Sequence, residues 1–183
     1  MSWISLEWQH DRVAGVAATV GRGGEINITA AFDWPCPDGV RLSSPNAAGA
    51  WLKVQLASHK LRGERLLVSM PREDVVAKRL ELPNAPDAEL PDLVKFQSAL
   101  KSSFSPEQIV VDFIPWPARV TGGQREALAA TISRESLSGV QTVANSVELK
   151  LAGLTVSSAA MAELVKRLPA VASNELSAVI LRR

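Results

Sequence analysis

The sequence has few of the side chains on which enzymes rely for chemistry. Among its 183 residues are one cysteine, two histidines and no tyrosine. Cys36, His10 and His59 stand far apart, so they do not have the spacing of a zinc site, and neither histidine is near enough in sequence to activate the thiol as a nucleophile. A single cysteine also excludes an internal disulfide framework, which is consistent with a reducing compartment.

An excess of charge is missing as well. Lysine and arginine number 20, aspartate and glutamate number 19, and the two signs alternate in segments such as 72–74 and 78–81. A nucleic-acid-binding domain usually shows a basic excess on one face. No apolar run approaches the roughly 18 residues that a membrane span requires, and residues 1–7 contain no basic leader. We therefore expect a soluble, cytoplasmic chain without a nucleic-acid partner.

The phosphate-binding motifs are absent too. The sequence contains neither Gly-x-x-x-x-Gly-Lys-Ser/Thr nor Gly-x-Gly-x-x-Gly. The glycines at 21–24 join two predicted strands, which indicates a hairpin turn rather than a phosphate cradle. Glu7, Asp11 and Asp112 would suit a two-metal nuclease site if they converged, but Glu7 and Asp11 flank a predicted turn, where acids are common. We expect no catalytic residue, no metal and no cofactor.

The hydrophobic pattern predicts a mixed α/β (α+β) fold with the element order βββαβ, βαββα and βαβ. Strands are indicated where apolar and polar residues alternate or where short apolar runs end at turns, and helices where apolar residues recur every three or four positions. The predicted strands span 3–8, 13–20, 25–32, 65–70, 75–82, 108–116, 125–132, 149–156 and 176–181. The predicted helices span 45–60 with Ser44 as N-cap, 87–104, a third capped by Ser133, and a fourth from Ser157 to Pro169.

The helix over 87–104 has an apolar face that matters for function. Leu90, Leu93, Phe96, Leu100 and Phe104 form this predicted face, with Val94 at its edge. A helix buries such a face against a core or a partner.

Four short blocks resemble the first half of PilM, the actin-like type IV pilus assembly family, which is related to the secretion protein GspL and the division protein FtsA. The blocks are residues 61–71, 75–83, 89–97 and 109–113. The resemblance implies a ribonuclease H/actin-like lobe with a mixed sheet, interrupted by an inserted βαββα subdomain. It places the lobe core at residues 1–74 plus 151–183 and the insert at 75–150.

The hairpin that binds nucleotide in this family departs from the family pattern. The family carries Asp-x-Gly and small hydroxyl residues there, whereas residues 6–11 contain no glycine, serine or threonine. We expect Trp8 and His10 to occupy the space where backbone approaches phosphate, and the family's second lobe to be absent after Arg183. The resemblance therefore implies a degenerate ATPase that is not an enzyme. Half of a working nucleotide-binding actin-like ATPase remains the alternative.

With nucleotide hydrolysis set aside, the function that the resemblance implies is scaffolding. Family members lie at the inner face of the inner membrane and receive a short peptide of a bitopic membrane protein in a groove between core and insert, which is extended-peptide recognition. This implies a protein-binding role in pilus assembly or type II secretion and leaves self-association open. The implied binding residues are Arg79, Pro83, Leu90, Val94 and Phe96. Core packing is the alternative role of the last three.

Overall fold

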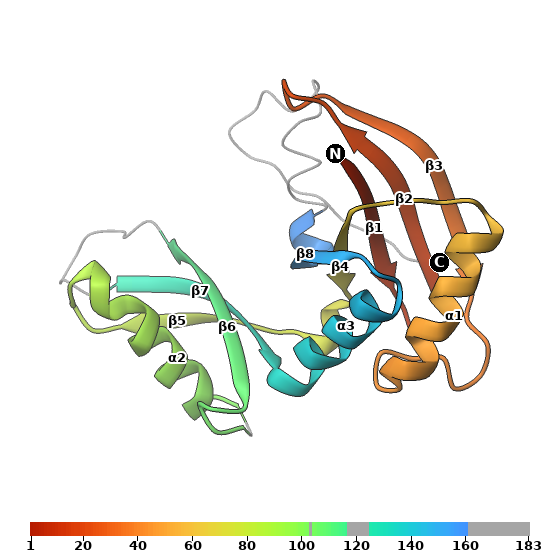
Figure 1. The fold of residues 1–183 in the computed structure, drawn as a ribbon. Helices are drawn as coiled ribbons and strands as arrows, with labels where there is room; N and C mark the ends of the chain where they lie inside the picture. Colours follow the sequence, from red (N-terminus) through yellow and green to blue (C-terminus); the bar gives the residue numbers. More distant parts are fainter. Residues whose placement is uncertain (103, 117–124, 161–183) are drawn as a thin grey trace.

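A five-stranded mixed sheet forms the larger part of the fold. The computed structural model describes residues 1–102, 104–116 and 125–160. Strands β1 (Ser2–Trp8), β2 (Arg12–Val20) and β3 (Ile26–Pro35) make the predicted antiparallel meander, and β4 (Arg65–Met70) and β8 (Lys150–Val156) extend it by parallel pairing. The strand order is β3-β2-β1-β4-β8 (Figure 1). The predicted mixed α/β class is confirmed.

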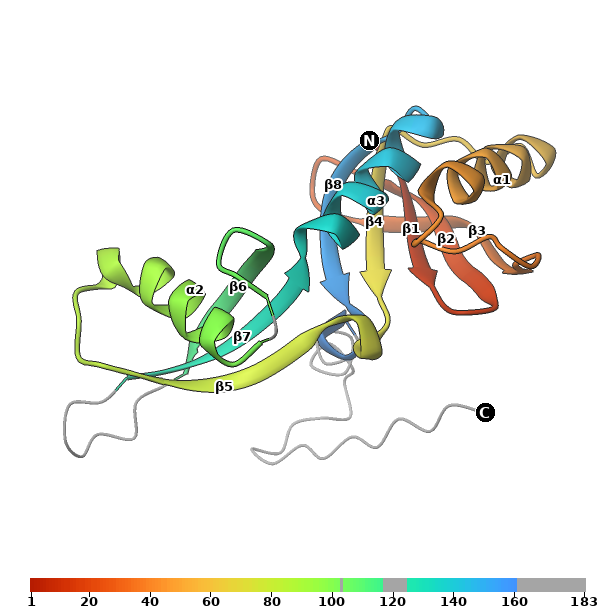
Figure 2. The same cartoon turned by 90° about the horizontal axis from the view of Figure 1, so that it is seen from below.

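Helices α1 (Pro45–Ser58) and α3 (Arg134–Ser146) cover one face of this sheet (Figure 2). Because side chains alternate along a strand, every second residue of β1 and β4 points into this layer. The buried core under the helices contains Ile4, Leu6, Trp8, Leu66, Val68, Leu52, Val140 and Val143. The predicted N-cap Ser44 does not cap α1 with its side chain; only its backbone carbonyl accepts a hydrogen bond, from the Ala48 amide at 3.0 Å.

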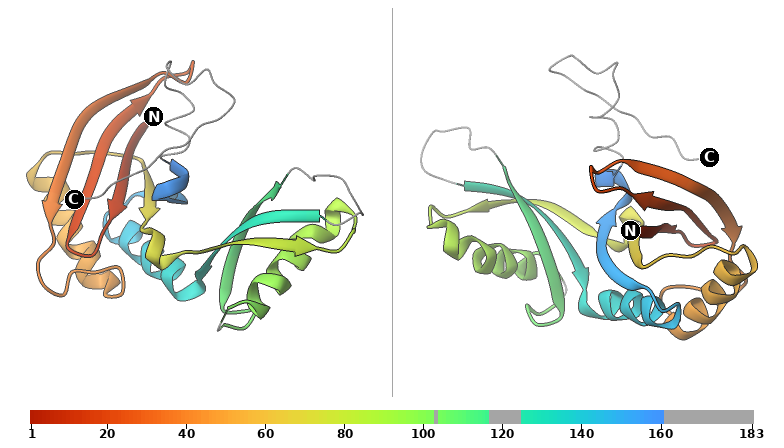
Figure 3. Two further views of the ribbon diagram at one scale, coloured as in Figure 1. Left: turned by 180° about the vertical axis from the view of Figure 1, so that it is seen from behind. Right: turned by 45° about the horizontal axis from the view of Figure 1, so that its top comes forward.

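A second, three-stranded sheet lies apart from the first, and the chain crosses between them from β4 to β5 and back from β7 to α3 (Figure 3). Its strands are β5 (Val76–Leu82), β6 (Ile109–Trp116) and β7 (Arg125–Ser133), in the antiparallel order β5-β7-β6. Helix α2 (Leu90–Leu100) covers one face and follows a 3₁₀ turn at Asp87–Glu89. The strands predicted over 108–116 and 125–132 are confirmed as β6 and β7.

The buried face of α2 matches the predicted one only in part. Leu90 and Val94 face the second sheet, together with Ser98 and Ala99, whereas Phe96 is 55% and Leu100 is 64% exposed. Leu93 packs against the edge of the same core. The helix therefore has a second apolar stripe on its outer side, and Val94, expected at the edge of the apolar face, is fully buried.

Helix α3 belongs by packing to the larger sheet. Val140, Val143 and Ala144 lie in the same core as β1 and β4, while the core of the second sheet is made by residues between Leu80 and Ala129. We propose on this basis that the inserted unit runs from 76 to 133, shorter than the 75–150 expected from the sequence. The chain is helical over 157–160; the rest of the predicted fourth helix and the predicted strand over 176–181 lie outside the described residues.

The start of α3 is fixed by the predicted cap. The Ser133 Oγ accepts a hydrogen bond from the Ser136 amide at 2.9 Å. Replacing Ser133 by alanine leaves this amide without its partner, and we expect a loss of about 1 kcal/mol in the free energy of unfolding. Denaturant titration measures the loss. Ser138→Ala, an exposed position within the same helix, is the matched control, and an equal loss in both variants would contradict the capping role.

Candidate functional site

In the described part of the chain, each sheet has one face that α1, α2 and α3 leave bare. In Figure 2, α1 and α3 lie above the larger sheet and α2 lies above the second sheet, so both bare faces turn to the opposite side. The helical turn at 157–160 lies on that side, with Ser157 and Ala160 beside Glu7 and Ser69. A bare sheet face can receive another chain, so we consider the two faces in turn.

The bare face of the second sheet combines aliphatic side chains with an ion pair. Leu128 in the central strand β7 lies opposite Arg79 of β5 on one side and Ile114 of β6 on the other, which puts these three side chains on one face. Ile114 is 67% and Leu128 39% exposed. Arg79 makes an ion pair with Glu126 on the same face. We call these four residues the bare-face patch.

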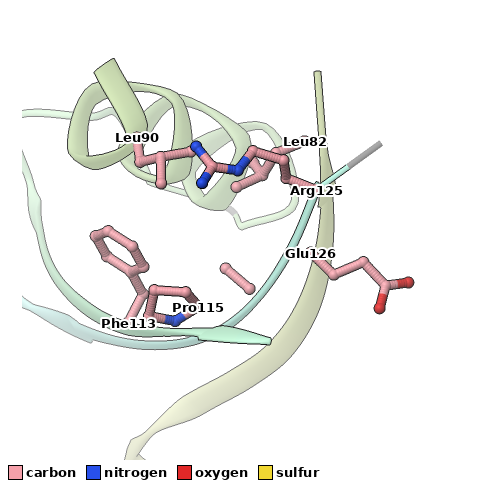
Figure 4. A pocket seen from close by; sticks show the side chains of 7 residues that line it. Leu82, Leu90, Phe113, Pro115, Arg125 and Glu126 are labelled. Atoms are coloured by element: carbon pink, nitrogen blue, oxygen red, sulfur yellow. The ribbon is translucent and has the colours of Figure 1, made fainter. Parts of the chain in front are cut away.

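A small pocket opens at the end of this sheet, between the strands and the start of α2 (Figure 4). Leu82, Leu90, Phe113 and Pro115 supply apolar walls, and Arg125 closes one side. Arg125 is held by the Ala85 carbonyl at 2.8 Å and by an Asp87 carboxylate oxygen at 2.6 Å. The volume of about 120 Å³ fits one side chain and falls well below the roughly 300–1,000 Å³ of a cofactor site.

The bare face of the larger sheet holds a polar network beside a shallow hollow of about 410 Å³. The Ser157 Oγ lies 3.0 Å from a Glu7 carboxylate oxygen and 3.1 Å from the Ser69 Oγ. The Met70 carbonyl lies 3.1 Å from the same Oγ. Since a hydroxyl has one proton, Ser157 donates to either Glu7 or Met70 while it accepts from Ser69. The network joins β1 and β4 to the helical turn that follows β8.

The expected obstruction by Trp8 is wrong. Trp8 is 2% exposed and packs edge-on against Trp51 of α1, with 6.1 Å between ring centroids, so it lies on the helix side of the sheet. Glu7, one residue earlier, faces the hollow instead. At this end of β1, the side chain that faces the hollow is therefore an acid with a serine partner.

The five residues implied as a binding site lie in different places. Arg79 is on the bare face of the second sheet, and Leu90 lines the end pocket. Val94 is buried between α2 and the second sheet. Phe96 is on the outer side of α2, and Pro83 is exposed just after β5. The structure brings Leu90 and Val94 together in one core and separates them from Phe96. The role of these five residues in binding remains a prediction.

Sequence reasoning did not select Ile114 and Leu128. Both sides of β6 carry large apolar residues, since Val111 and Phe113 pack toward α2 while Ile114 points away. Alternation alone therefore does not distinguish the covered face from the bare one. The register with β5 supplies the missing signal, because Leu128 lies opposite Arg79, a charged residue that stays in water.

Catalytic and metal chemistry find little support in the described part of the chain. There, no group of three histidine, cysteine or acidic residues is placed to hold a metal ion. Burial, followed by the negative charge of Asp11, raises the pKa of the Cys36 thiol, which lowers the thiolate fraction at neutral pH and is opposite to what a nucleophile requires. Glu7 and Asp112, two of the three acids considered for a two-metal nuclease site, belong to different sheets.

Comparison with known proteins shows the fold. No family model and no curated protein sequence matches the chain. The structure is similar to a solved PilM–PilN type IV pilus biogenesis complex, with a TM-score of 0.76 and 21% identity over 91% of this chain and 51% of the other. It also resembles the cytoplasmic domain of EpsL, an inner-membrane component of the Vibrio cholerae type II secretion system, with a TM-score of 0.57, 9% identity, and coverage of 85% and 57%.

The resemblance deduced from the sequence is thus shown at the level of fold. The chain spans about half the length of both solved chains. Among the described residues, no helix is long and apolar enough to cross a membrane. What the whole proteins do, and with which partners, is carried to this chain only as a proposal.

Proposed function

We propose that the chain is a non-catalytic scaffold that binds a short extended segment of a membrane-anchored protein, at the inner face of the inner membrane, in a type IV pilus or type II secretion assembly. Two solved structures of this fold come from those assemblies. The observation that carries the proposal is the bare-face patch, where Ile114 and Leu128 expose aliphatic surface next to a charge pair. Such a surface suits extended peptides, whose alternate side chains contact one face.

The chemistry of the patch defines the ligand. Apolar side chains at every second position of a peptide would cover Ile114 and Leu128, which lie opposite each other in neighbouring strands. Arg79 and Glu126 stand at the border, where a polar group of the peptide meets an existing ion pair. The end pocket lies on the α2 side of the same sheet, where Leu82, Leu90 and Phe113 point, so it is separate from this peptide surface. The ligand that suits the patch is therefore a partly apolar, weakly charged peptide rather than a nucleotide or a metal.

The test is calorimetric titration of the purified chain with N-terminal peptides of the pilus and secretion membrane proteins encoded in the same genome. We expect binding, and Ile114→Lys is expected to weaken it at least tenfold, about 1.4 kcal/mol, because a charge replaces a desolvated aliphatic contact. The matched control is Leu100→Lys, equally exposed at 64% against 67% but on the outer side of α2. Absence of binding to every peptide would overturn the proposed function; loss in the Leu100 variant alone would move the site to α2.

A nucleotide-binding half of an actin-like ATPase is the second candidate. The observation that favours it is the hollow beside Glu7, which is large enough for part of a nucleotide and includes an acid at the end of β1. The same calorimeter tests it with Mg-ATP. Heat of binding that disappears in Glu7→Gln would make this candidate the leading one, while no heat at millimolar nucleotide removes it.

A further inference from the structure

The outer edge of β3 is the most open strand edge of the described fold. Among the described residues, β3 pairs with β2 only, so one row of its backbone N–H and C=O groups faces outward. The strand is ten residues long, and seven of those residues are exposed, including all of the first four. An unpaired edge of this kind is a template for another strand.

Other edges carry the features that discourage pairing. Strand β5 has Lys78, Arg79 and Glu81, and β6 has Asp112 and Pro115. Charges and prolines on edge strands are ordinary protections against edge-to-edge association. In contrast, residues 26–32 contain neither a charge nor a proline. The remaining edge, β8, is mostly half-buried rather than exposed.

Two isoleucines make the first part of this edge apolar. Ile26 is 63% and Ile28 is 60% exposed, and with one residue between them they project from the same face of the strand. The nearest charge, Glu25, folds back, so that its carboxylate lies against Gly21 and Gly23 of the preceding turn. The edge therefore presents aliphatic side chains and open backbone groups without a neighbouring repulsive charge.

A bulge limits the segment that can pair. Ala17 lies opposite Ala30 while Ala18 lies opposite Ile28, so Thr29 is an extra residue in β3. The Thr29 hydroxyl donates to the Ala17 carbonyl at 3.1 Å, which closes the bulge within its own sheet. Since a bulge bends the strand, the straight part available for pairing is centred on Asn27.

We propose that this edge pairs with the same edge of a second copy of the chain, antiparallel, about a two-fold axis at Asn27. In this register Ile26 lies opposite Ile28 of the second copy and Ile28 opposite its Ile26, all on one face, and Asn27 lies opposite Asn27. Cross-strand aliphatic pairs stabilise such a ladder, and a two-fold contact uses the same patch on both subunits. The proposal is independent of the peptide-binding function.

The second copy fits better than an unrelated strand because the segment is complementary to itself. Glu25 falls opposite Thr29, so no like charges meet across the axis. We expect the dimer not to grow further by strand pairing, because the other edges of the described sheets are charged, proline-containing or half-buried. With about five residue pairs in contact we expect a weak dimer, with a Kd on the order of 100 µM, as is usual for small interfaces.

Sedimentation velocity of the full chain between about 5 and 500 µM tests the proposal, in the concentration range set by the expected Kd. We expect a shift from monomer to dimer, and at least a tenfold higher Kd for Ile28→Lys. Val54→Lys is the control, since Val54 is also 60% exposed but lies on α1. A monomer at every concentration, open-ended aggregation, or equal weakening by both variants would overturn the proposal.

A cross-link reports the register itself. In a Cys36→Ser background, Asn27→Cys places two thiols opposite each other at the axis, within the roughly 4.4–6.8 Å between Cα atoms that a disulfide needs. Oxidised glutathione is expected to give a covalent dimer of Asn27→Cys and none of Thr19→Cys, an exposed β2 position beside it. If instead the membrane-partner peptides protect Asn27→Cys from modification and no dimer forms, the edge serves a foreign strand and the proposal fails.

Discussion

Aspartate in place of Val94 is expected to unfold α2 and the second sheet, whereas aspartate in place of Phe96, two residues along the same helix, is expected to leave both folded. Val94 is fully buried in an apolar core that includes Leu80, Leu82 and Ala129. A carboxylate there loses its hydration without gaining a partner, which costs about 3–5 kcal/mol. That is comparable with the roughly 5–15 kcal/mol that holds a whole domain together.

Phe96 is 55% exposed, and substitutions at such surface positions usually change stability by about 0.5 kcal/mol or less. Hydrogen exchange read by mass spectrometry resolves the two outcomes, because the amides of β6 and β7 lose protection only if the second sheet opens. We expect this loss in Val94→Asp and near-native protection in Phe96→Asp. The reverse pattern would mean that α2 buries the face predicted from its sequence.

This experiment also bears on the binding residues. A Val94 variant that fails to bind a partner peptide reports the loss of the second sheet rather than of a contact, because Val94 contributes to its core. Phe96→Asp keeps the fold and is therefore the informative variant for the predicted role of Phe96 in binding. Arg79→Ala serves in the same way for the bare face.

The α2 face shows where sequence reasoning reaches its limit. The apolar face expected from the sequence runs from Leu90 through Phe96 and Leu100, but Leu90 and Val94 stand four residues apart and also form a stripe of their own. The first contains larger side chains and looks more favourable to bury. The structure buries the second because β5 and β7 fill the space under α2 with Leu80, Leu82 and small alanines, and that complementarity is not visible along one helix.

The first half of the larger sheet was easier to predict. Ile4, Leu6 and Trp8 alternate with polar residues, and β1 follows this alternation closely. The same alternation already places Glu7 on the face opposite Trp8, so the side chain beside the hollow could have been identified from the sequence. The bare-face patch could not, because it depends on the register between β5 and β7, which α2 and β6 separate in the chain.

Valine in place of Gly49 is expected to lower the free energy of unfolding by about 3 kcal/mol, because overpacking a tight contact costs about 1–3 kcal/mol and the second branch adds to it. Gly49 is where α1 meets α3. A Cβ there would lie 2.5 Å from the Ser146 Oγ and 2.6 Å from its Cβ. The Ser146 Cβ is fixed to the backbone of α3, so the two helices must move apart above the sheet.

Denaturant unfolding with two companion variants separates this steric cost from helix propensity. Ala50→Val, at the exposed neighbouring position of α1, introduces the same side chain without the contact to α3 and is expected to cost about 0.5 kcal/mol. Ser146→Gly removes the side chain that Gly49→Val meets, so in that background most of the cost of Gly49→Val should disappear, because the next nearest atom, the Val143 Cα at 3.5 Å, is at an ordinary van der Waals distance. Equal costs of Gly49→Val in both backgrounds would show that α1 and α3 do not touch at this point. The two helices would then not form the packed layer that covers one face of the larger sheet.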